Sequence, residues 1–269
     1  EESLTLYREA GNLHGQALAE NSLANVYFDM GQWTRADQNY RQAGQIFSQL
    51  GNVYNRAMVE NNLGGIALNQ GRLDDAIHFY QSALGSLERI GGSIWIMGAL
   101  HLNLGATHIR RQEAVTGLDH LQTSRELFDR AKNRDLLPEL HRRLAEGYLA
   151  LGNLEAANDA AQQSMALARD LAVLGEQGLA SETMGRIAAA KGQPEASEAN
   201  LQQAIELLEK VGDDYGLACA QLSLAEVYDR SKQFRRRDEL LDQCVPVFTR
   251  LGATIEIARA QPLLEASPA

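Results

Sequence analysis

The sequence is poor in several features that define large classes of protein. Its two cysteines, Cys219 and Cys244, have neither CxxC spacing nor the density of a disulfide framework, so we interpret them as reduced core residues of a cytoplasmic protein. No apolar run approaches the roughly 18 residues that a membrane-spanning helix needs, and no membrane partner is expected. Acidic residues outnumber basic ones by 35 to 25. Because phosphate binding depends on clustered Lys and Arg, direct nucleic-acid binding is not expected either.

Catalytic and metal-binding motifs are also missing from the sequence. It contains no glycine-rich phosphate loop and no HExxH, GxSxG or EF-hand pattern. Of the six histidines, only His101 and His108 share an expected helix. Two helical turns separate them by about 10 Å along the axis, which is too far for one metal ion without help from other ligands. We therefore expect a chain that is not an enzyme and has no metal site and no cofactor.

What the sequence does have is a repeat of about 40 residues. One large apolar position recurs at steps of 40 or 41 residues, at Leu23, Leu63, Leu104, Leu144, Met184, Leu224 and Leu264. The residue after it is Ala or Gly in every full copy, which predicts that two helix backbones approach closely there. In the first copy, small and large residues at helical spacing lie on both sides of Gly31, and this pattern is typical of a helix, a turn and a second helix.

This pattern resembles the tetratricopeptide repeat, in which a large, a small and an aromatic residue precede a turn glycine, and small, aromatic and small residues follow it. The unit here is longer than the usual one. It is similar to repeats in the sensor regions of bacterial signalling ATPases and of transcription activators of the maltose-activator type, and in kinesin light chains. The resemblance implies an all-α, right-handed superhelical solenoid of helix-turn-helix hairpins, with a ligand groove on its concave face.

The repeat positions predict where each hairpin begins and ends. Six hairpins are expected, at residues 11–50, 51–90, 91–131, 132–171, 172–211 and 212–251. Residues 1–10 match the end of a preceding repeat's second helix, and residues 252–269 are expected to form a C-terminal capping helix with a frayed tail. Gln112 and Lys232 replace the turn glycine of other copies, so either the turn differs there or its backbone is strained.

The resemblance places the binding site on the concave wall, on first-helix residues that point away from the core. These candidate residues are Asn21, Asn25, Phe28, Asp29, Asn61, Leu68, Asn69, Ile109, Arg110, Arg142, Glu146, Leu149, Glu182, Arg186, Glu226 and Arg230. An asparagine amide can both donate to and accept from a peptide backbone, although these asparagines can also be merely exposed polar positions. The alternation of Arg and Glu in the C-terminal half can equally form an internal ladder of ion pairs.

From these features we predict a non-catalytic module, part of a larger bacterial cytoplasmic protein, that binds a protein or peptide segment on the concave groove. A small-molecule effector is a further possible ligand. The first alternative is a sensor or autoinhibitory arm of a signalling ATPase or transcription regulator, which would contact its own catalytic domains. The second alternative is a self-associating scaffold.

Overall fold

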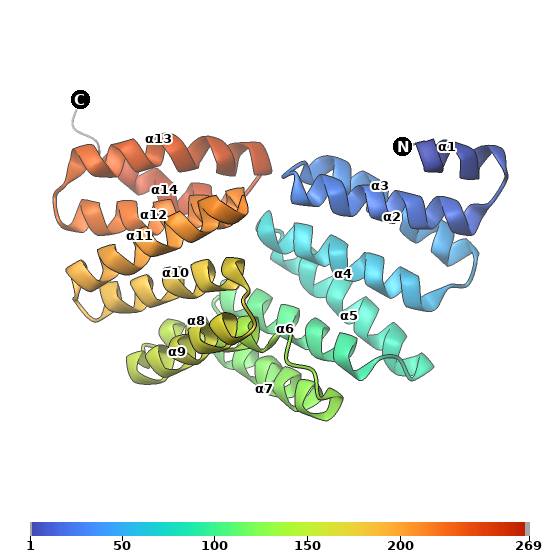
Figure 1. The fold of residues 1–269 in the computed structure, drawn as a ribbon, viewed down its shortest axis with the longest axis horizontal. Coiled ribbons are helices and arrows are strands. Elements are labelled where there is room, and N and C mark those ends of the chain that lie inside the picture. The colour runs from blue at the N-terminus through green and yellow to red at the C-terminus, as the bar shows by residue number, and fades with distance from the viewer. Residues whose placement is uncertain (1, 267–269) are drawn as a thin grey trace.

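The computed structural model describes residues 2–266, and this part of the chain consists of helices and short turns without a β-strand. The helices are α1 (Glu2–Glu9), α2 (Leu13–Asp29), α3 (Trp33–Gln49), α4 (Val53–Asn69), α5 (Leu73–Ile90), α6 (Ile94–Arg110), α7 (Ala114–Ala131), α8 (Leu137–Ala150), α9 (Leu154–Asp170), α10 (Leu174–Ala190), α11 (Pro194–Val211), α12 (Asp214–Arg230), α13 (Phe234–Leu251) and α14 (Thr254–Glu265). Successive helices pack as antiparallel pairs (Figure 1). The predicted all-α repeat solenoid is therefore confirmed. Residues 267–269 of the tail that we expected to fray lie outside the described residues.

Close contact between paired helices depends on small residues in both helices and on large residues of the second helix that pack against them. Ala24 and Ala36 are fully buried, and Tyr40 is almost fully buried beside them. In the next hairpin, Gly64 of α4 lies under the ring of Tyr80 from α5, so closely that a Cβ atom on Gly64 would be 2.5 Å from Tyr80 Cε1. The small residues found in the sequence therefore have the packing role that the repeat pattern predicts.

Arg237 is an exception at one of these small positions. The sequence places it where other copies have Ala, Gly or Ser, yet its side chain is fully buried at the start of α13. Its guanidinium pairs with Asp229 at 2.6 Å and with Asp238 at 2.7 Å. Two carboxylates thus compensate the buried charge, which makes an arginine tolerable inside the hairpin.

A residue with left-handed backbone geometry follows nearly all of the described helices within two positions of the helix end. Gly31 and Gly51 are examples, with φ of 67° and 65°. Gln112, Lys132, Ala172 and Lys232 adopt the same region without being glycine, with φ of 67°, 53°, 55° and 58°. The turns at Gln112 and Lys232 therefore keep the geometry of the other copies, and the backbone carries the strain of a side chain in that region.

Ala172→Gly is expected to stabilise the fold by up to about 1 kcal/mol, because left-handed geometry costs an L-residue about 1–2 kcal/mol and the extra flexibility of glycine offsets only part of that gain. The change in unfolding free energy is measured by urea denaturation. Ala166→Gly is the matched control, because Ala166 is exposed within α9. The same substitution there should destabilise by about 1 kcal/mol. If both substitutions changed the unfolding free energy in the same direction, backbone strain at Ala172 would be contradicted.

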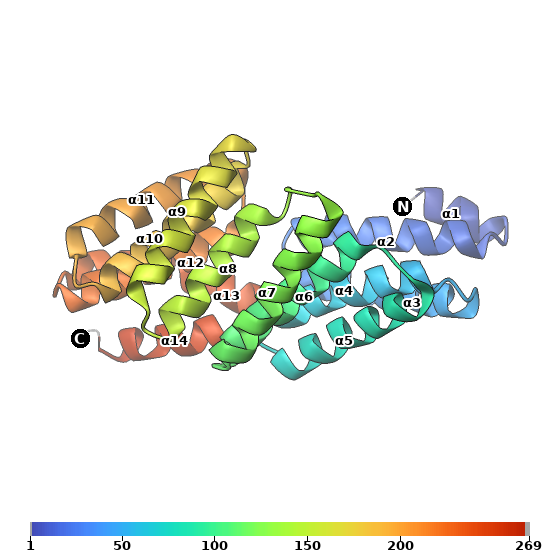
Figure 2. The ribbon, with the colours of Figure 1, turned by 90° about the horizontal axis from the view of Figure 1, so that it is seen from below.

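The hairpins follow an arc that brings the first and last hairpins side by side (Figure 1). The rings of Trp33 and Tyr215 meet edge to face, with centroids 5.4 Å apart. Gln70 Nε2 donates to the Leu251 carbonyl at 3.4 Å, and Thr254 Oγ1 donates to the Gln70 carbonyl at 2.8 Å. Figure 2 shows α6 and α7 between the two ends of the arc. The first and last hairpins therefore both border the concave side of the solenoid. No described helix is long and apolar enough to cross a membrane.

Candidate functional site

A cavity of about 970 Å³ lies on the inner side of the arc. It is lined by side chains from all six hairpins and from α14, chiefly from the first helix of each hairpin. Apolar side chains, paired charges and three aromatic rings share this lining. This size and mixed character are typical of a ligand site, where apolar surface provides affinity and a few polar groups fix orientation.

Most of the predicted groove residues lie in this cavity. Those that line it are Phe28, Asp29, Leu68, Asn69, Ile109, Arg110, Arg142, Glu146, Leu149, Glu182, Arg186 and Glu226. The residues that do not line it are Asn21, Asn25, Asn61 and Arg230.

The asparagines outside the cavity include two that bond neighbouring helices. The Tyr40 hydroxyl donates to Asn25 Oδ1 at 2.6 Å, and Asn103 Nδ2 donates to Asn61 Oδ1 at 2.9 Å. Arg230 is exposed at the end of α12. Because none of the four residues lines the cavity, we leave them out of the proposed site and retain the other twelve.

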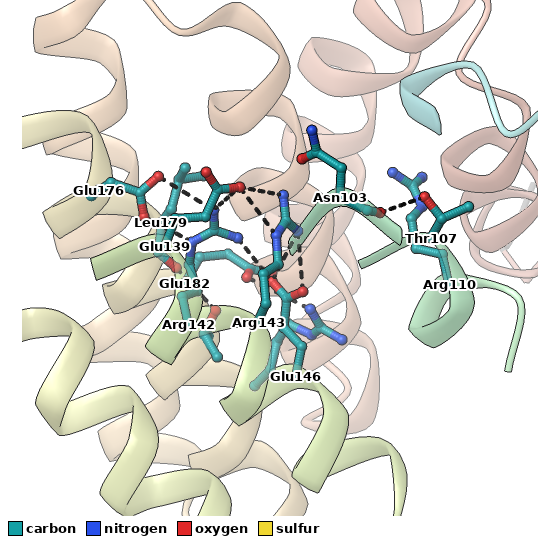
Figure 3. Close-up of polar contacts among 12 residues, drawn as sticks. Asn103, Thr107, Arg110, Glu139, Arg142, Arg143, Glu146, Glu176, Leu179 and Glu182 are labelled. Carbon is teal, nitrogen blue, oxygen red and sulfur yellow. Dashed lines mark hydrogen bonds and ion pairs between the residues drawn. The ribbon is translucent and has the colours of Figure 1, made fainter. Parts of the chain in front are cut away.

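A group of charged side chains in the cavity, joined by several ion pairs, comes from α8 and α10 (Figure 3). Arg142 is only 4% exposed. It donates to Glu176 from Nε at 3.0 Å and to Glu146 from Nη1 at 3.0 Å, and its Nη2 lies 3.5 Å from Glu139. Arg143 binds Glu139 and Glu146 as well, at 3.2 and 3.1 Å. We call these five residues the Arg142 cluster.

Mutual attraction keeps the Arg142 cluster ionised. Burial alone would raise the pKa of Glu146, but the charges of Arg143, Arg142 and Arg186 lower it to about 2. Burial would likewise lower the pKa of Arg142, yet Glu176, Glu146 and Glu139 raise it. The ion pairs of the Arg142 cluster therefore hold its charged groups in fixed positions in the cavity wall without a ligand.

The other end of the cavity is aromatic. Phe28 stacks on Trp33 with ring centroids 6.0 Å apart, and Trp33 in turn meets Tyr215. Arg110 Nη1 donates to the Tyr215 hydroxyl at 2.9 Å, while its Nη2 pairs with Glu256. Burial is the main reason why the pKa of Tyr215 is raised, so its hydroxyl stays protonated. Arg110 thereby links α6 to α12 and α14.

Several cavity residues were missed from sequence because they lie outside the repeat stripe that we followed. Trp33 is the first residue of α3, a second helix, and Tyr215 meets it because the arc brings α12 beside α3. Glu176 and Glu256 carried a usable signal. They lie two repeat lengths apart and each is the third residue of its helix, but acids are common there because the helix dipole favours them.

Solved structures share this fold at low sequence identity. Aspartyl phosphate phosphatase F from Bacillus subtilis aligns with a TM-score of 0.72 at 16% identity over 88% of this chain, and this chain spans only 60% of that protein. A Rap protein complexed with competence and sporulation factor aligns with a TM-score of 0.70 at 12% identity, covering 94% of this chain and 74% of that one. A signal transduction ATPase with numerous domains and a tetratricopeptide repeat sensor, from Pyrococcus horikoshii, has a TM-score of 0.62 at 12% identity, covering 91% and 36%. No curated protein matches the chain.

The arc of paired helices around a lined cavity defines a helical-repeat solenoid. Residues 15–89, which cover most of α2 to α5, match the family model described as Tetratricopeptide repeat. Residues 15–89 therefore carry the tetratricopeptide repeat that the sequence pattern predicted, and the rest of the described chain continues the same helical-repeat fold.

Proposed function

We propose that this chain is a non-catalytic binding module that holds a segment of a partner protein in its central cavity. The observation that carries this proposal is the cavity itself, which draws side chains from every hairpin and already has its charged groups bound in place. A site organised in advance loses less conformational entropy when a ligand binds. The half-buried Phe28, Ile109 and Leu149 would give the segment apolar contacts.

Two further observations support binding rather than chemistry at this site. The cavity arginines are paired with carboxylates, as in the Arg142 cluster and at Arg110 with Glu256. Burial raises the pKa of the cavity thiol, Cys219, so this thiol is held in its unreactive neutral form. The similar Rap protein is complexed with competence and sporulation factor, which also supports a binding role for a solenoid of this shape.

A cavity-blocking variant tests the proposal. Ala150 is an exposed cavity residue at the end of α8, and Ala150→Trp is expected to fill space there without disturbing the core. Random displayed peptides are selected on the purified chain, and the Kd of each enriched peptide is then measured by fluorescence anisotropy. We expect Ala150→Trp to weaken binding roughly tenfold or more, since the indole would occupy cavity space that a bound segment needs.

Leu151→Trp is the matched control for this experiment. Leu151 is the next residue, is 51% exposed and does not line the cavity. Peptides that bind the Leu151→Trp variant and lose affinity for Ala150→Trp would support the proposed site. Peptides that bind both variants equally well would place binding elsewhere on the molecule.

A second candidate function is a sensor arm of a larger signalling protein. It is favoured by the Pyrococcus horikoshii ATPase, whose tetratricopeptide repeat sensor gives this fold and whose alignment covers 91% of this chain. In this case the cavity would hold a small effector or a segment of the protein's own catalytic domains. Selected peptides that match a stretch of the same full-length protein would favour this function over binding to a separate partner.

A further inference from the structure

The charges that line the cavity are unequal in number. Nine carboxylates and five guanidinium groups line it, and Lys and His are absent from the described lining. Arg250, which lies outside the lining, offsets one of the carboxylates by pairing with Asp214 at 2.7 Å. The cavity therefore keeps a surplus of negative charge, which favours a cationic ligand.

The cavity arginines are already engaged by carboxylates of the same chain. Arg142 and Arg143 belong to the Arg142 cluster, and Arg110 pairs with Glu256. Arg259 pairs with Glu226 at 2.9 Å, and Arg186 Nη1 lies 3.7 Å from Glu182. An anionic ligand would therefore compete with these carboxylates for the guanidinium groups.

Two carboxylates at the aromatic end, by contrast, retain free acceptor oxygens. Asp29 is exposed and makes no hydrogen bond or ion pair within the described residues. Glu256 is 4% exposed; one of its oxygens accepts from Arg110, but Oε2 has no donor in the described chain. A buried acceptor without a donor is costly, so a donor supplied by a ligand would be favourable there.

A series of ring contacts connects these two carboxylates in the lining. Phe28 precedes Asp29 and stacks on Trp33, whose ring meets Tyr215, and Tyr215 shares Arg110 with Glu256. We call Phe28, Asp29, Trp33, Tyr215 and Glu256 the aromatic-acidic wall. Aromatic faces attract ammonium and guanidinium groups, and carboxylates pair with them.

Resting on the proposed function, we infer that the bound segment presents a lysine or arginine side chain to the aromatic-acidic wall. The same chemistry would also accept the ammonium groups of a free polyamine. The unsatisfied oxygen of Glu256 and the unpaired carboxylate of Asp29 are the acceptors for the cation, and the rings cover its apolar stem.

The test uses capped peptides in which one central position is Lys, Arg, Nε-acetyl-Lys or Glu and the remaining positions are mixed. Their Kd values for the purified chain are measured by isothermal titration calorimetry. Acetyl-lysine has the length of lysine without its charge, so it isolates the ionic contribution. We expect the Lys and Arg peptides to bind roughly tenfold or more tightly than the acetyl-Lys and Glu peptides, as a hydrogen-bonded charge pair implies.

Asp29→Asn should abolish most of this preference. It is not expected to disturb the fold, since Asp29 is exposed and makes no hydrogen bond or ion pair within the described residues. Asp159→Asn is the matched control, because it removes the same charge from an exposed position on α9 away from the cavity. It should leave the preference unchanged. An equal loss in both variants would indicate a long-range charge effect and overturn the inference.

The remaining outcomes separate this inference from the proposed function. One outcome is that peptides bind equally well with acetyl-Lys or Glu, yet lose affinity for Ala150→Trp. This would contradict the inferred preference for a cationic side chain and would still support the proposed binding function. Failure of every peptide, or binding that Ala150→Trp does not weaken, would overturn both. Spermidine is the last probe. If it binds more tightly than the peptides and Asp29→Asn weakens it, the cation comes from a free polyamine.

Discussion

Replacing Gly64 with alanine is expected to destabilise the fold by about 1–3 kcal/mol, the range of an overpacked core, and Gly64→Leu by more. The added Cβ atom would be 2.5 Å from Tyr80 Cε1 and 2.8 Å from two other ring atoms. Tyr80 is only 1% exposed, so its ring has no free space to move into. The expected sign is unusual, because Gly→Ala inside a helix ordinarily stabilises by about 1 kcal/mol. Urea denaturation measures the change.

Gly65→Ala is the matched control for this prediction. Gly65 is the next residue of the same helix, but its added Cβ would lie 3.9 Å from the Tyr80 hydroxyl, an ordinary contact. We expect Gly65→Ala to keep or raise the unfolding free energy by up to about 1 kcal/mol through helix propensity alone. Equal effects of the two substitutions would contradict the packing of α4 against α5.

The contact at Gly64 was predictable because it repeats. A small residue follows the large apolar position in every full copy, and a feature of one hairpin is local enough to be visible in a short stretch of sequence. The same holds for the turns, where glycine recurs at the helix ends and adopts left-handed geometry. Fold class, repeat length and core were therefore accessible from the sequence.

The candidate site was only partly accessible, because it depends on how far the arc turns. Arg110 fitted the predicted groove, yet its partners Tyr215 and Glu256 lie 105 and 146 residues further along the chain. The repeat pattern contains no information about such pairs, since each repeat specifies contacts with its neighbours only. Arg237 illustrates the same limit within one hairpin. The Arg235–Arg237 run is typical of a solvated helix start, but Asp229 and Asp238 allow Arg237 to be buried.

The Arg142 cluster provides the second prediction of large effect. Arg142→Met is expected to destabilise the fold by about 3–5 kcal/mol, because removing one partner leaves buried charges uncompensated. Methionine keeps much of the side-chain volume, so the loss reports charge more than packing. Glu139, Glu146 and Glu176 would then face one another with Arg143 as the nearest remaining cation of the cluster. Arg235→Met is the surface control. Arg235 is 92% exposed beside Glu239, and exposed pairs of this kind contribute about 0–1 kcal/mol.

The pH dependence of the Arg142→Met effect distinguishes lost charge pairing from lost packing. The folded chain lowers the pKa of Glu146 from 4.5 to about 2, after the attraction of Arg143, Arg142 and Arg186 overcomes the effect of burial. The ionised form is thus favoured by folding, and its contribution is present above pH 4.5 and is lost as the pH falls towards 2. The difference in unfolding free energy between wild type and Arg142→Met should therefore be largest near neutral pH and shrink in acid. Urea denaturation at a series of pH values measures this difference. A difference that stays constant over that range would assign the role of Arg142 to packing alone.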